Sequence, residues 1–384
     1  MRLLLILLFF CSVGFGQEVR QALPADDRVS TWDARAKFLA GIALPPEEPL
    51  AKLQQQSAYR TNAAAFEKMW DRYNEHYFSR MRVWSAAELA PKVSMSLPVY
   101  YFFGGPDAIS PLAFFPEAPD FVLGGLEPVG SVPSLNSLPP PRLQAALESL
   151  RKSTDVILSF GFFITKDMRA ELEAGEFKGV TPVMLVFLAV SGCEVLDVTY
   201  FGVKGDGTSE EYGAELRQSK GVLPGVKITF RKSATSAPQR IHYVQANVAD
   251  DALHSGSGLL RWAEGFGSGN VYLKAASYLL HESYFSKIRG FLLSQGRSVL
   301  QDDSGIPFSF FQNGEWRLWY FGTYTGTLDL FKKCRQPKLI DAFRSSGVPL
   351  AFGTGYKWRL GQSNLLLAVK QEPPKAVPVS APSN

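Results

Sequence analysis

Carboxylates that follow predicted strands are the residues of this sequence best suited to chemistry. Asp107 ends a Gly-Gly-Pro-Asp segment, Glu127 follows Gly-Gly-Leu, and Asp302 and Asp303 precede Ser-Gly-Ile-Pro. In an open α/β sheet, ligands bind beyond the carboxyl ends of the strands, so these acids could converge on a metal, a sugar or a cationic group. Each could instead cap a helix or begin a turn. Asp107 with Asp302 and Asp303 is the favoured group, because neighbouring glycines let backbone approach a ligand closely.

A second set of polar residues lies near the segment 270–275. Lys274 interrupts this apolar strand-like segment, either as an edge residue with its ammonium in water or beside a carboxylate. Ser277 and His281 follow closely and could form a hydrolase triad with an aspartate, although sequence proximity does not fix their orientation. His281-Glu282 begins like a zinc-protease helix but lacks the second histidine. The candidate cleft therefore includes Lys274 and His281.

A Ser/Gly segment is the candidate anion-binding loop. It lies between a predicted strand ending near 247 and a predicted helix at 259–264, where exposed backbone N–H groups at a helix start favour an anion. It could equally be a flexible connection. Its residues are Ser255, Gly256, Ser257 and Gly258. The glycine-rich segment 265–269 precedes its strand, which is the wrong order for a dinucleotide fingerprint.

Standard motifs for catalysis and cofactors are absent from the sequence. There is no Gly-x-Ser-x-Gly elbow, no phosphate-binding Walker loop and no Cys-x-x-Cys, and the chain has only 4 histidines. We therefore expect neither a metal nor a cofactor, and no phosphoryl-transfer or NAD-linked role. The Gly-Asp-Gly at 205–207 favours a hairpin turn, with a calcium loop as the alternative because Glu210 and Glu211 are near.

Composition indicates a globular protein with no affinity for nucleic acid. The chain is 46% hydrophobic and 20% charged, and its 40 basic and 36 acidic residues are interleaved instead of gathered in runs. Cys193 and Cys334 could form a disulfide in an oxidising compartment, or Cys193 could be a buried free thiol.

The first sixteen residues have the pattern of a cleavable export signal. Arg2 precedes a short apolar run at 3–10, which is too short to span about 30 Å of hydrocarbon. Small residues at 14 and 16 predict cleavage before Gln17, and release by cleavage is favoured over a lipid anchor on Cys11 because Phe10 precedes that cysteine. We expect no membrane span later in the chain and an exported, periplasmic or extracellular protein.

The rest of the chain changes texture near residue 96. Residues 17–95 predict a helical segment, with helices at 34–40 and 51–82. Beyond it, strands alternate with helices, which favours an α/β (or α+β) fold with a mixed β-sheet and flanking helices. The predicted strands are 99–103, 120–124, 156–163, 183–190, 194–201, 226–231, 240–247, 270–275, 298–301 and 315–320. The predicted helices are 141–152, 259–264 and 284–295.

The order of these elements suggests a domain at 96–370 and a disordered, proline-rich tail at 371–384. A similar order of elements occurs twice, which allows a duplication into halves of about 96–220 and 221–370. The aromatic residues near 316–324 fit a core or a carbohydrate platform. The favoured function is an exported, soluble binding or accessory protein that holds a small polar ligand or a protein partner in a cleft, with a secreted hydrolase as the alternative. The oligomeric state stays open.

Overall fold

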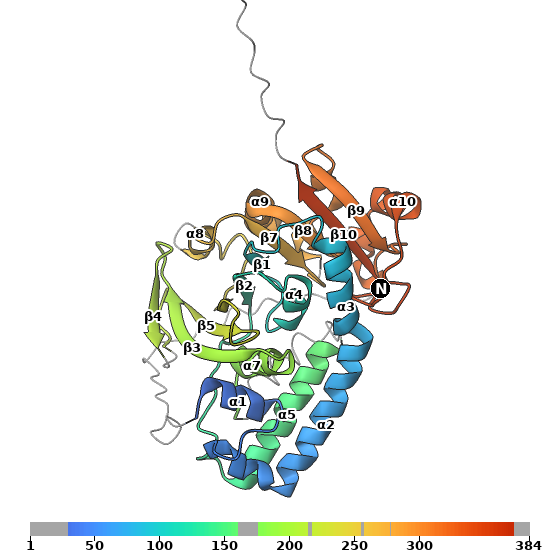
Figure 1. The fold of residues 1–384 in the computed structure, drawn as a ribbon. Helices are drawn as coiled ribbons and strands as arrows, with labels where there is room; N and C mark the ends of the chain where they lie inside the picture. Colours follow the sequence, from blue (N-terminus) through green and yellow to red (C-terminus); the bar gives the residue numbers. More distant parts are fainter. Residues whose placement is uncertain (1–29, 160–175, 214–216, 255–256, 277, 372–384) are drawn as a thin grey trace, which may run out of the picture.

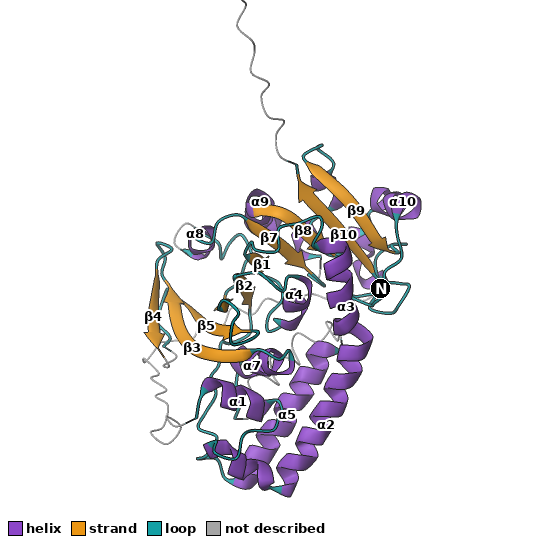
Figure 2. Cartoon of the chain, in the orientation of Figure 1, coloured by secondary structure: helices purple, strands orange, loops and turns teal. Residues whose placement is uncertain are grey.

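The computed structural model describes residues 30–159, 176–213, 217–254, 257–276 and 278–371 (Figure 1). Ten strands form one sheet in the order β4-β3-β5-β6-β2-β1-β7-β8-β10-β9. The sheet contains parallel and antiparallel pairs and is flanked by helices, so the predicted mixed α/β fold is confirmed (Figure 2). The strands are β1 (Val99–Tyr101), β2 (Asp120–Gly125), β3 (Glu194–Val203), β4 (Ser209–Gly213), β5 (Leu223–Arg231), β6 (Gln239–Gln245), β7 (Gly269–Leu273), β8 (Gly296–Gln301), β9 (Trp316–Gly322) and β10 (Asn364–Lys370).

The α-helices cover the two faces of this sheet. They are α1 (Trp32–Leu39), α2 (Ser57–Tyr73), α3 (Ser79–Trp84), α4 (Ile109–Phe114), α5 (Pro140–Leu158), α7 (Val180–Val190), α8 (Leu259–Glu264), α9 (Ser286–Gln295) and α10 (Pro337–Ser346). Single π-helical turns at 74–78 and 85–89 connect and extend α2 and α3, so the predicted N-terminal helical segment is confirmed.

Five parallel strands form the centre of the sheet. They lie in the order β6-β2-β1-β7-β8, and every neighbouring pair among them is parallel. Numbered along the chain, this spatial order is 3-2-1-4-5, the arrangement of a doubly wound sheet. The chain leaves β1 toward β2 on one side, and later returns to place β7 on the other side. The loops after β1 and β7 therefore diverge and leave a crevice at the carboxyl edge of the sheet.

Alternating side chains of the strands supply two hydrophobic cores, one on each face. Tyr101 and Leu123 belong to the core under α2, α4, α5 and α7, whereas Tyr100 and Val122 belong to the core under α8 and α9. This alternation follows from the two-residue period of a strand. Because both faces are covered, the central strands are apolar on both sides. The result is a three-layer arrangement with the sheet between two layers of helices.

The segment at 183–190, predicted as a strand, is a helix. It belongs to α7, in which Val180 to Ala189 are all buried. A helix buried all round carries no polar stripe, so the sequence lacks the period that would separate it from a buried strand. Pro182 in its first turn is the local signal, because proline suits the start of a helix and not a central strand.

The described part of the segment 156–163 does not form the predicted strand. Helix α5 continues through Val156 to Leu158, and residues 160–163 lie outside the described part of the chain. The comparison of two halves depended on this strand, so the duplication stays a prediction. Each of the other predicted strands corresponds to a strand of the sheet, although the bounds differ by a few residues. Strands β4 and β10 were not predicted.

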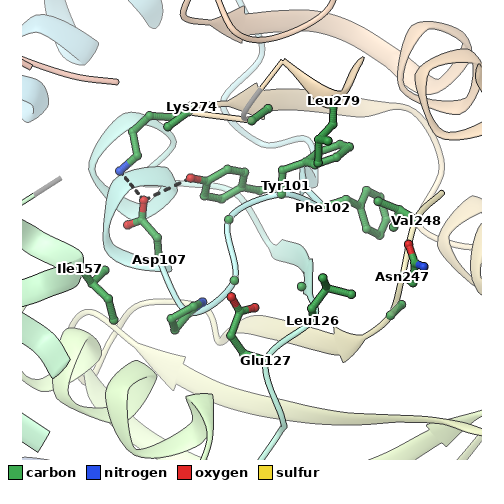
Figure 3. Close-up of a pocket in the computed structure, with 18 of the residues that line it drawn as sticks. Tyr101, Phe102, Asp107, Leu126, Glu127, Ile157, Asn247, Val248, Lys274 and Leu279 are labelled. Atoms are coloured by element: carbon green, nitrogen blue, oxygen red, sulfur yellow. Dashed lines mark hydrogen bonds and ion pairs between the residues drawn. The ribbon is translucent and has the colours of Figure 1, made fainter. Parts of the chain in front are cut away.

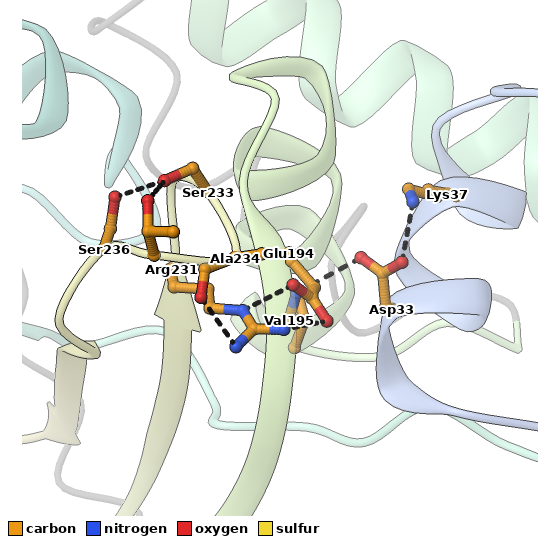
Figure 4. Close-up of polar contacts among 9 residues, drawn as sticks. Asp33, Lys37, Glu194, Val195, Arg231, Ser233, Ala234 and Ser236 are labelled. Atoms are coloured by element: carbon orange, nitrogen blue, oxygen red, sulfur yellow. Dashed lines mark hydrogen bonds and ion pairs between the residues drawn. The ribbon is translucent and has the colours of Figure 1, made fainter.

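Contacts with β3, the neighbour of the edge strand β4, attach the N-terminal helix α1. Asp33 Oδ1 accepts a hydrogen bond from Val195 N at 3.2 Å, and Lys37 pairs with Asp33 at 2.7 Å (Figure 4). Beside them, Arg231 binds both carboxylate oxygens of Glu194, with Nε 2.6 Å from Oε2. The bidentate geometry holds β5 against β3 next to the helix.

Several local predictions can be compared with the described residues. Strands β5 and β6 are antiparallel neighbours, and the 205–207 segment is a turn closed by a hydrogen bond from Lys204 N to Thr208 O at 2.8 Å. Both hairpin predictions are therefore confirmed.

Cys193 and Cys334 are free thiols, and burial raises the pKa of Cys193 to about 11. None of the described helices combines the length and apolar character needed to cross a membrane.

Candidate functional site

A pocket opens at the carboxyl edge of the five parallel strands, in the crevice between the loops that follow β1 and β7. Its volume is about 210 Å³. The loops after β1, β2, β6 and β7 each contribute to its wall (Figure 3). Its polar side chains include Asp107, Glu127, Asn247 and Lys274, and its apolar side chains include Phe102, Phe103, Leu126, Val248, Leu279 and Phe285. This is the position at which doubly wound sheets bind ligands.

Asp107 and Lys274 form a buried ion pair across the crevice. Lys274 Nζ lies 2.5 Å from Asp107 Oδ2 and donates to Ser110 Oγ at 3.0 Å. Tyr101 OH donates to the same Asp107 oxygen at 3.2 Å (Figure 3). Burial, and after it the charge of Asp107, raises the pKa of Tyr101 well above its usual value, which keeps the phenol a donor. The pair connects the loop after β1 to the end of β7.

Helix α4 completes the surroundings of Asp107. Ser110 N and Ser110 Oγ donate to Asp107 Oδ1 at 3.2 and 2.9 Å. Asp107 therefore accepts hydrogen bonds from the first turn of this short helix and also pairs with Lys274. The interpretation of Lys274 as a lysine beside a carboxylate is confirmed, and the solvent-exposed alternative is wrong because Lys274 is only 3% exposed.

Glu127 lies on the other wall of the pocket, just beyond β2. Tyr243 OH donates to the Glu127 backbone oxygen at 2.8 Å and lies 3.5 Å from Oε2. Two glycines let the carboxylate lie against backbone: a Cβ at Gly125 would be 2.3 Å from Glu127 Oε2, and one at Gly105 would be 2.9 Å from it. Gly105 also has a φ of +52°, which glycine tolerates best.

Asp302 and Asp303 support the pocket from behind and are not among its lining residues. Asp302 accepts hydrogen bonds from Ala275 N at 2.9 Å and from Ser304 N at 3.0 Å. Asp303 accepts from Tyr278 OH at 2.5 Å and from Asn364 Nδ2 at 2.7 Å. The two aspartates thus hold the segment after β7, in which Ala275 and Tyr278 have left-handed φ values of +52° and +57°. Such values cost on the order of 1 kcal/mol or more each.

Burial dominates the titration of these two acids. It raises the pKa of Asp302 to about 7, with the charge of Asp303 as the second cause. The pKa of Asp303 is also raised by burial. His281 lies behind the same segment, against the ring of Tyr278, and burial lowers the pKa of His281 to about 4. A neutral His281 outside the pocket lining does not contribute a cation to a ligand.

Asp250, a further acid after β6, has a structural role, and some of the remaining predicted residues lie outside the described part of the chain. Asp250 caps helix α9 by accepting from Ser286 N at 3.1 Å and from Lys287 N at 2.9 Å. Of the candidate anion loop, Ser255 and Gly256 lie outside the described residues, as does Ser277. Gly258 packs so tightly on Lys204 O that no Cβ would fit there. The anion loop stays a prediction.

Several pocket residues have no distinctive signal in the sequence. Leu126, Val248 and Leu279 are apolar loop residues, and only their neighbours' places in the sheet bring them together. Asn247 Oδ1 accepts from Ala249 N at 3.0 Å, which fixes its amide at the rim of the pocket. Among the described residues, no cluster of three or more His, Cys, Asp or Glu could hold a metal ion.

The fold and the site together define a mixed α/β protein with a pocket of about 210 Å³ at the topological switch point of its sheet. Comparison with protein-family models, curated proteins and solved structures found no match to the chain.

Proposed function

We propose that this protein binds a ribonucleoside in the switch-point pocket. The observation that carries the proposal is the position of Glu127, directly after β2 and 22 residues after Gly105 (127 minus 105). In doubly wound sheets, an acidic residue roughly 20 positions beyond the glycine turn after the first strand accepts hydrogen bonds from ribose hydroxyls. A carboxylate has about four lone-pair sites, so it can receive two neighbouring hydroxyls and still keep other partners.

The remaining wall suits the base of such a ligand. Leu126, Val248 and Leu279 supply an apolar surface beyond Glu127, and the Asn247 amide lies at its rim (Figure 3). A flat, largely apolar ring with polar atoms on its edge matches this combination of side chains.

The volume of the pocket limits the size of the ligand. About 210 Å³ is below the range of roughly 300–1,000 Å³ that is typical of pockets for drug-sized ligands. A mononucleoside therefore fits this pocket better than a dinucleotide does.

The hydrolase alternative has weaker support. Ser110 is within 3.0 Å of Lys274 Nζ, but Ser110 is 1% exposed, and Lys274 Nζ also lies 2.5 Å from Asp107 Oδ2. The serine hydroxyl is therefore buried away from a substrate, and it donates to Asp107 Oδ1 at 2.9 Å. Asp302 and Asp303, the other acids considered for this role, do not line the pocket. They accept hydrogen bonds from Ala275 N and Tyr278 OH in the segment after β7.

Substitution of Glu127 tests the proposal. In isothermal titration with adenosine, we expect Glu127→Gln to weaken binding by about 10- to 100-fold, because hydrogen bonds to a charged group contribute about 1.5–3 kcal/mol. We also expect the wild type to bind 2′-deoxyadenosine more weakly than adenosine. The variant should discriminate far less between the two ligands, since the partner of the missing hydroxyl is itself altered.

A matched control is Glu211→Gln, which makes the same change on the exposed strand β4. It should leave adenosine binding unchanged. Adenosine binding that Glu127→Gln leaves unchanged in a folded protein would refute the proposed role of Glu127. No binding of any of the four common ribonucleosides to the wild type would refute the function itself.

A further inference from the structure

We propose that two adjoining surface loops of this protein bind the surface of a membrane that contains anionic lipids. The first loop comprises residues 326–335, between β9 and α10, and the second comprises residues 356–361, which precede β10. The proposal goes beyond the nucleoside site and is independent of it, because it uses no residue that lines the switch-point pocket.

A cluster of aromatic rings holds the two loops side by side. The ring centroid of Phe331, in the first loop, lies 5.2 Å from that of Tyr356, in the second. Both rings also contact Tyr278 in the segment after β7, at 4.7 and 6.0 Å. Lys357 Nζ donates to Gly326 O, which is a further connection between the loops. The two loops therefore form one surface that is attached to the body of the protein.

Both loops expose large apolar side chains. Leu330 is 72% exposed in the first loop, whereas Leu360 is 63% and Trp358 is 38% exposed in the second. Single exposed leucines are common on soluble proteins, but several large apolar side chains on one surface mark an interaction site. Tryptophan is enriched where membranes meet water, because its ring is apolar and its N–H can stay in contact with water. These side chains suit insertion into the interfacial layer of a bilayer.

Basic side chains surround the apolar ones. The exposed basic residues of the two loops are Lys332, Lys333, Arg335 and Arg359. Asp329 is an exposed acid of the first loop. Burial, and after it the charge of Glu282, raises the pKa of Cys334, which places Glu282 beside the same surface. Four positive charges against two negative charges leave an excess of +2 (4 minus 2), so the surface is complementary to anionic headgroups.

The kinds of side chain favour a lipid surface over an acidic protein. Interfaces between proteins are depleted in lysine, whereas lysine beside exposed leucine and tryptophan is typical of segments that lie in a membrane interface. Lys332 and Lys333 directly follow Leu330 and Phe331 in the sequence. Their long side chains can keep the ammonium groups among the headgroups while the neighbouring leucine enters the apolar layer.

Co-sedimentation with lipid vesicles tests the proposal. One vesicle contains phosphatidylcholine alone, and the other contains equal parts of phosphatidylcholine and phosphatidylglycerol. We expect about 10-fold or tighter binding to the anionic vesicle, since each basic residue near such a surface strengthens binding by about fivefold. The preference should shrink with salt, because the screening length falls from about 10 Å at 0.1 M to about 3 Å at 1 M.

Charge variants locate the binding surface. Lys332→Gln/Lys333→Gln should weaken binding to the anionic vesicle by about 10-fold or more. The control Lys52→Gln/Lys68→Gln removes two exposed lysines from the N-terminal helical segment and causes the same change in net charge. It should weaken binding by about twofold or less. Every variant keeps the full chain, so any contribution of the apolar run at 3–10 is common to all of them.

Apolar variants test insertion into the bilayer. Leu330→Ser should weaken binding by about fivefold or more at low and at high salt, because the buried apolar area is lost. Val83→Ser is the matched control, since Val83 is 71% exposed, and it should bind as the wild type does. Brominated phosphatidylcholine in the vesicle should quench part of the tryptophan fluorescence, and Trp358→Phe should remove that part.

The outcomes separate this proposal from its alternative and from the nucleoside site. Equal binding to both vesicles, or equal losses in the loop variants and their controls, would overturn the proposal. Binding to soluble polyglutamate as tight as to the anionic vesicle, and unchanged in Leu330→Ser, would assign the surface to an acidic protein instead. The loop variants should bind adenosine as the wild type does, so the failure of either proposal leaves the other intact.

Discussion

Asp302 illustrates how a strand-end carboxylate can belong to the support of a pocket without lining it. Its three donors are Ala275 N, Ser304 N and Ser304 Oγ, so it fixes the wall segment after β7 from below. The price is a buried charge, which is why the pKa of Asp302 rises to about 7. The carboxylate therefore stabilises the local geometry and opposes folding electrostatically at high pH.

The pH dependence of stability should reveal this acid. Because the pKa of Asp302 in the folded state lies above its unfolded value of about 3.8, its contribution to stability is complete below pH ~4 and is lost as the pH rises through about 7. Asp302→Asn lacks this contribution and offers one acceptor oxygen in place of two to Ala275 N and Ser304 N. We expect the variant to be destabilised more at pH 5 than at pH 8, by a difference on the order of 1–4 kcal/mol.

Urea unfolding at the two pH values measures this difference. Asp251→Asn, at an exposed position, controls for the introduction of an amide. An equal or larger loss of stability for Asp302→Asn at pH 8 would show that burial does not raise the pKa of this carboxyl.

The sequence identifies the strand-end acids as candidate site residues, but it does not show which of them line the pocket and which support it. Asp107, Glu127, Asp302 and Asp303 all follow parallel strands, so their shared edge could be predicted from topology. Which of them faces the pocket depends on side-chain partners such as Ser110 and Tyr278 that lie in other segments. Glu127 is among the candidate cleft residues that the sequence predicts, but the favoured group of Asp107, Asp302 and Asp303 leaves it out, and its spacing from Gly105 is not used in that prediction.

At the scale of elements, the ends of β1 and β2 depend on each other through two glycines. A Cβ at Gly125 would approach Gly105 Cα to 2.9 Å and Glu127 Oε2 to 2.3 Å. The glycines thus allow two neighbouring loops to close on one carboxylate. The position of the Glu127 carboxylate therefore depends on the conformation of these two loops as well as on the presence of a glutamate at position 127.

We expect Gly125→Ala to weaken adenosine binding by about as much as Glu127→Gln does, because the added methyl displaces the same carboxylate. Isothermal titration and thermal unfolding measure the two effects. Gly290→Ala in α9 is the control, since nothing lies within 4 Å of its added Cβ. The control should bind normally and gain up to about 1 kcal/mol of stability. Normal binding by Gly125→Ala would show that the close packing around Glu127 is not required.

Helices and strands could be predicted where the sequence shows a clear hydrophobic periodicity. The prediction failed where an element is buried on all sides, because such an element has no alternation of polar and apolar residues. Helix α8 has the predicted bounds, and α5 and α9 were located with shifted ends. Helix α7 is apolar on every side, so tertiary packing decided its structure and the pattern of residues 183–190 could not. The strand β10 follows a turn-rich stretch and was not predicted, because its alternation is hidden by burial on both faces.

At the scale of the whole molecule, the export signal remains a prediction, because residues 1–29 lie outside the described part of the chain. Expressed with its own N-terminus in a bacterium that exports proteins, the mature protein should begin at Gln17 and carry no lipid. Intact mass and N-terminal sequencing measure both. A lipidated Cys11, or retention of residues 1–16, would contradict the prediction.

The place of β10 in the sheet has a consequence for the order in which the protein can fold. This strand comes last in the described chain, yet it lies between β8 and β9 and hydrogen-bonds to both. Until it arrives, β8 and β9 present unpaired edges that can associate with other chains. Residues 364–370 must therefore leave the ribosome before β10 can pair with β8 and β9. Any partner that shields those two edges during synthesis would protect the chain from aggregation at its most vulnerable stage.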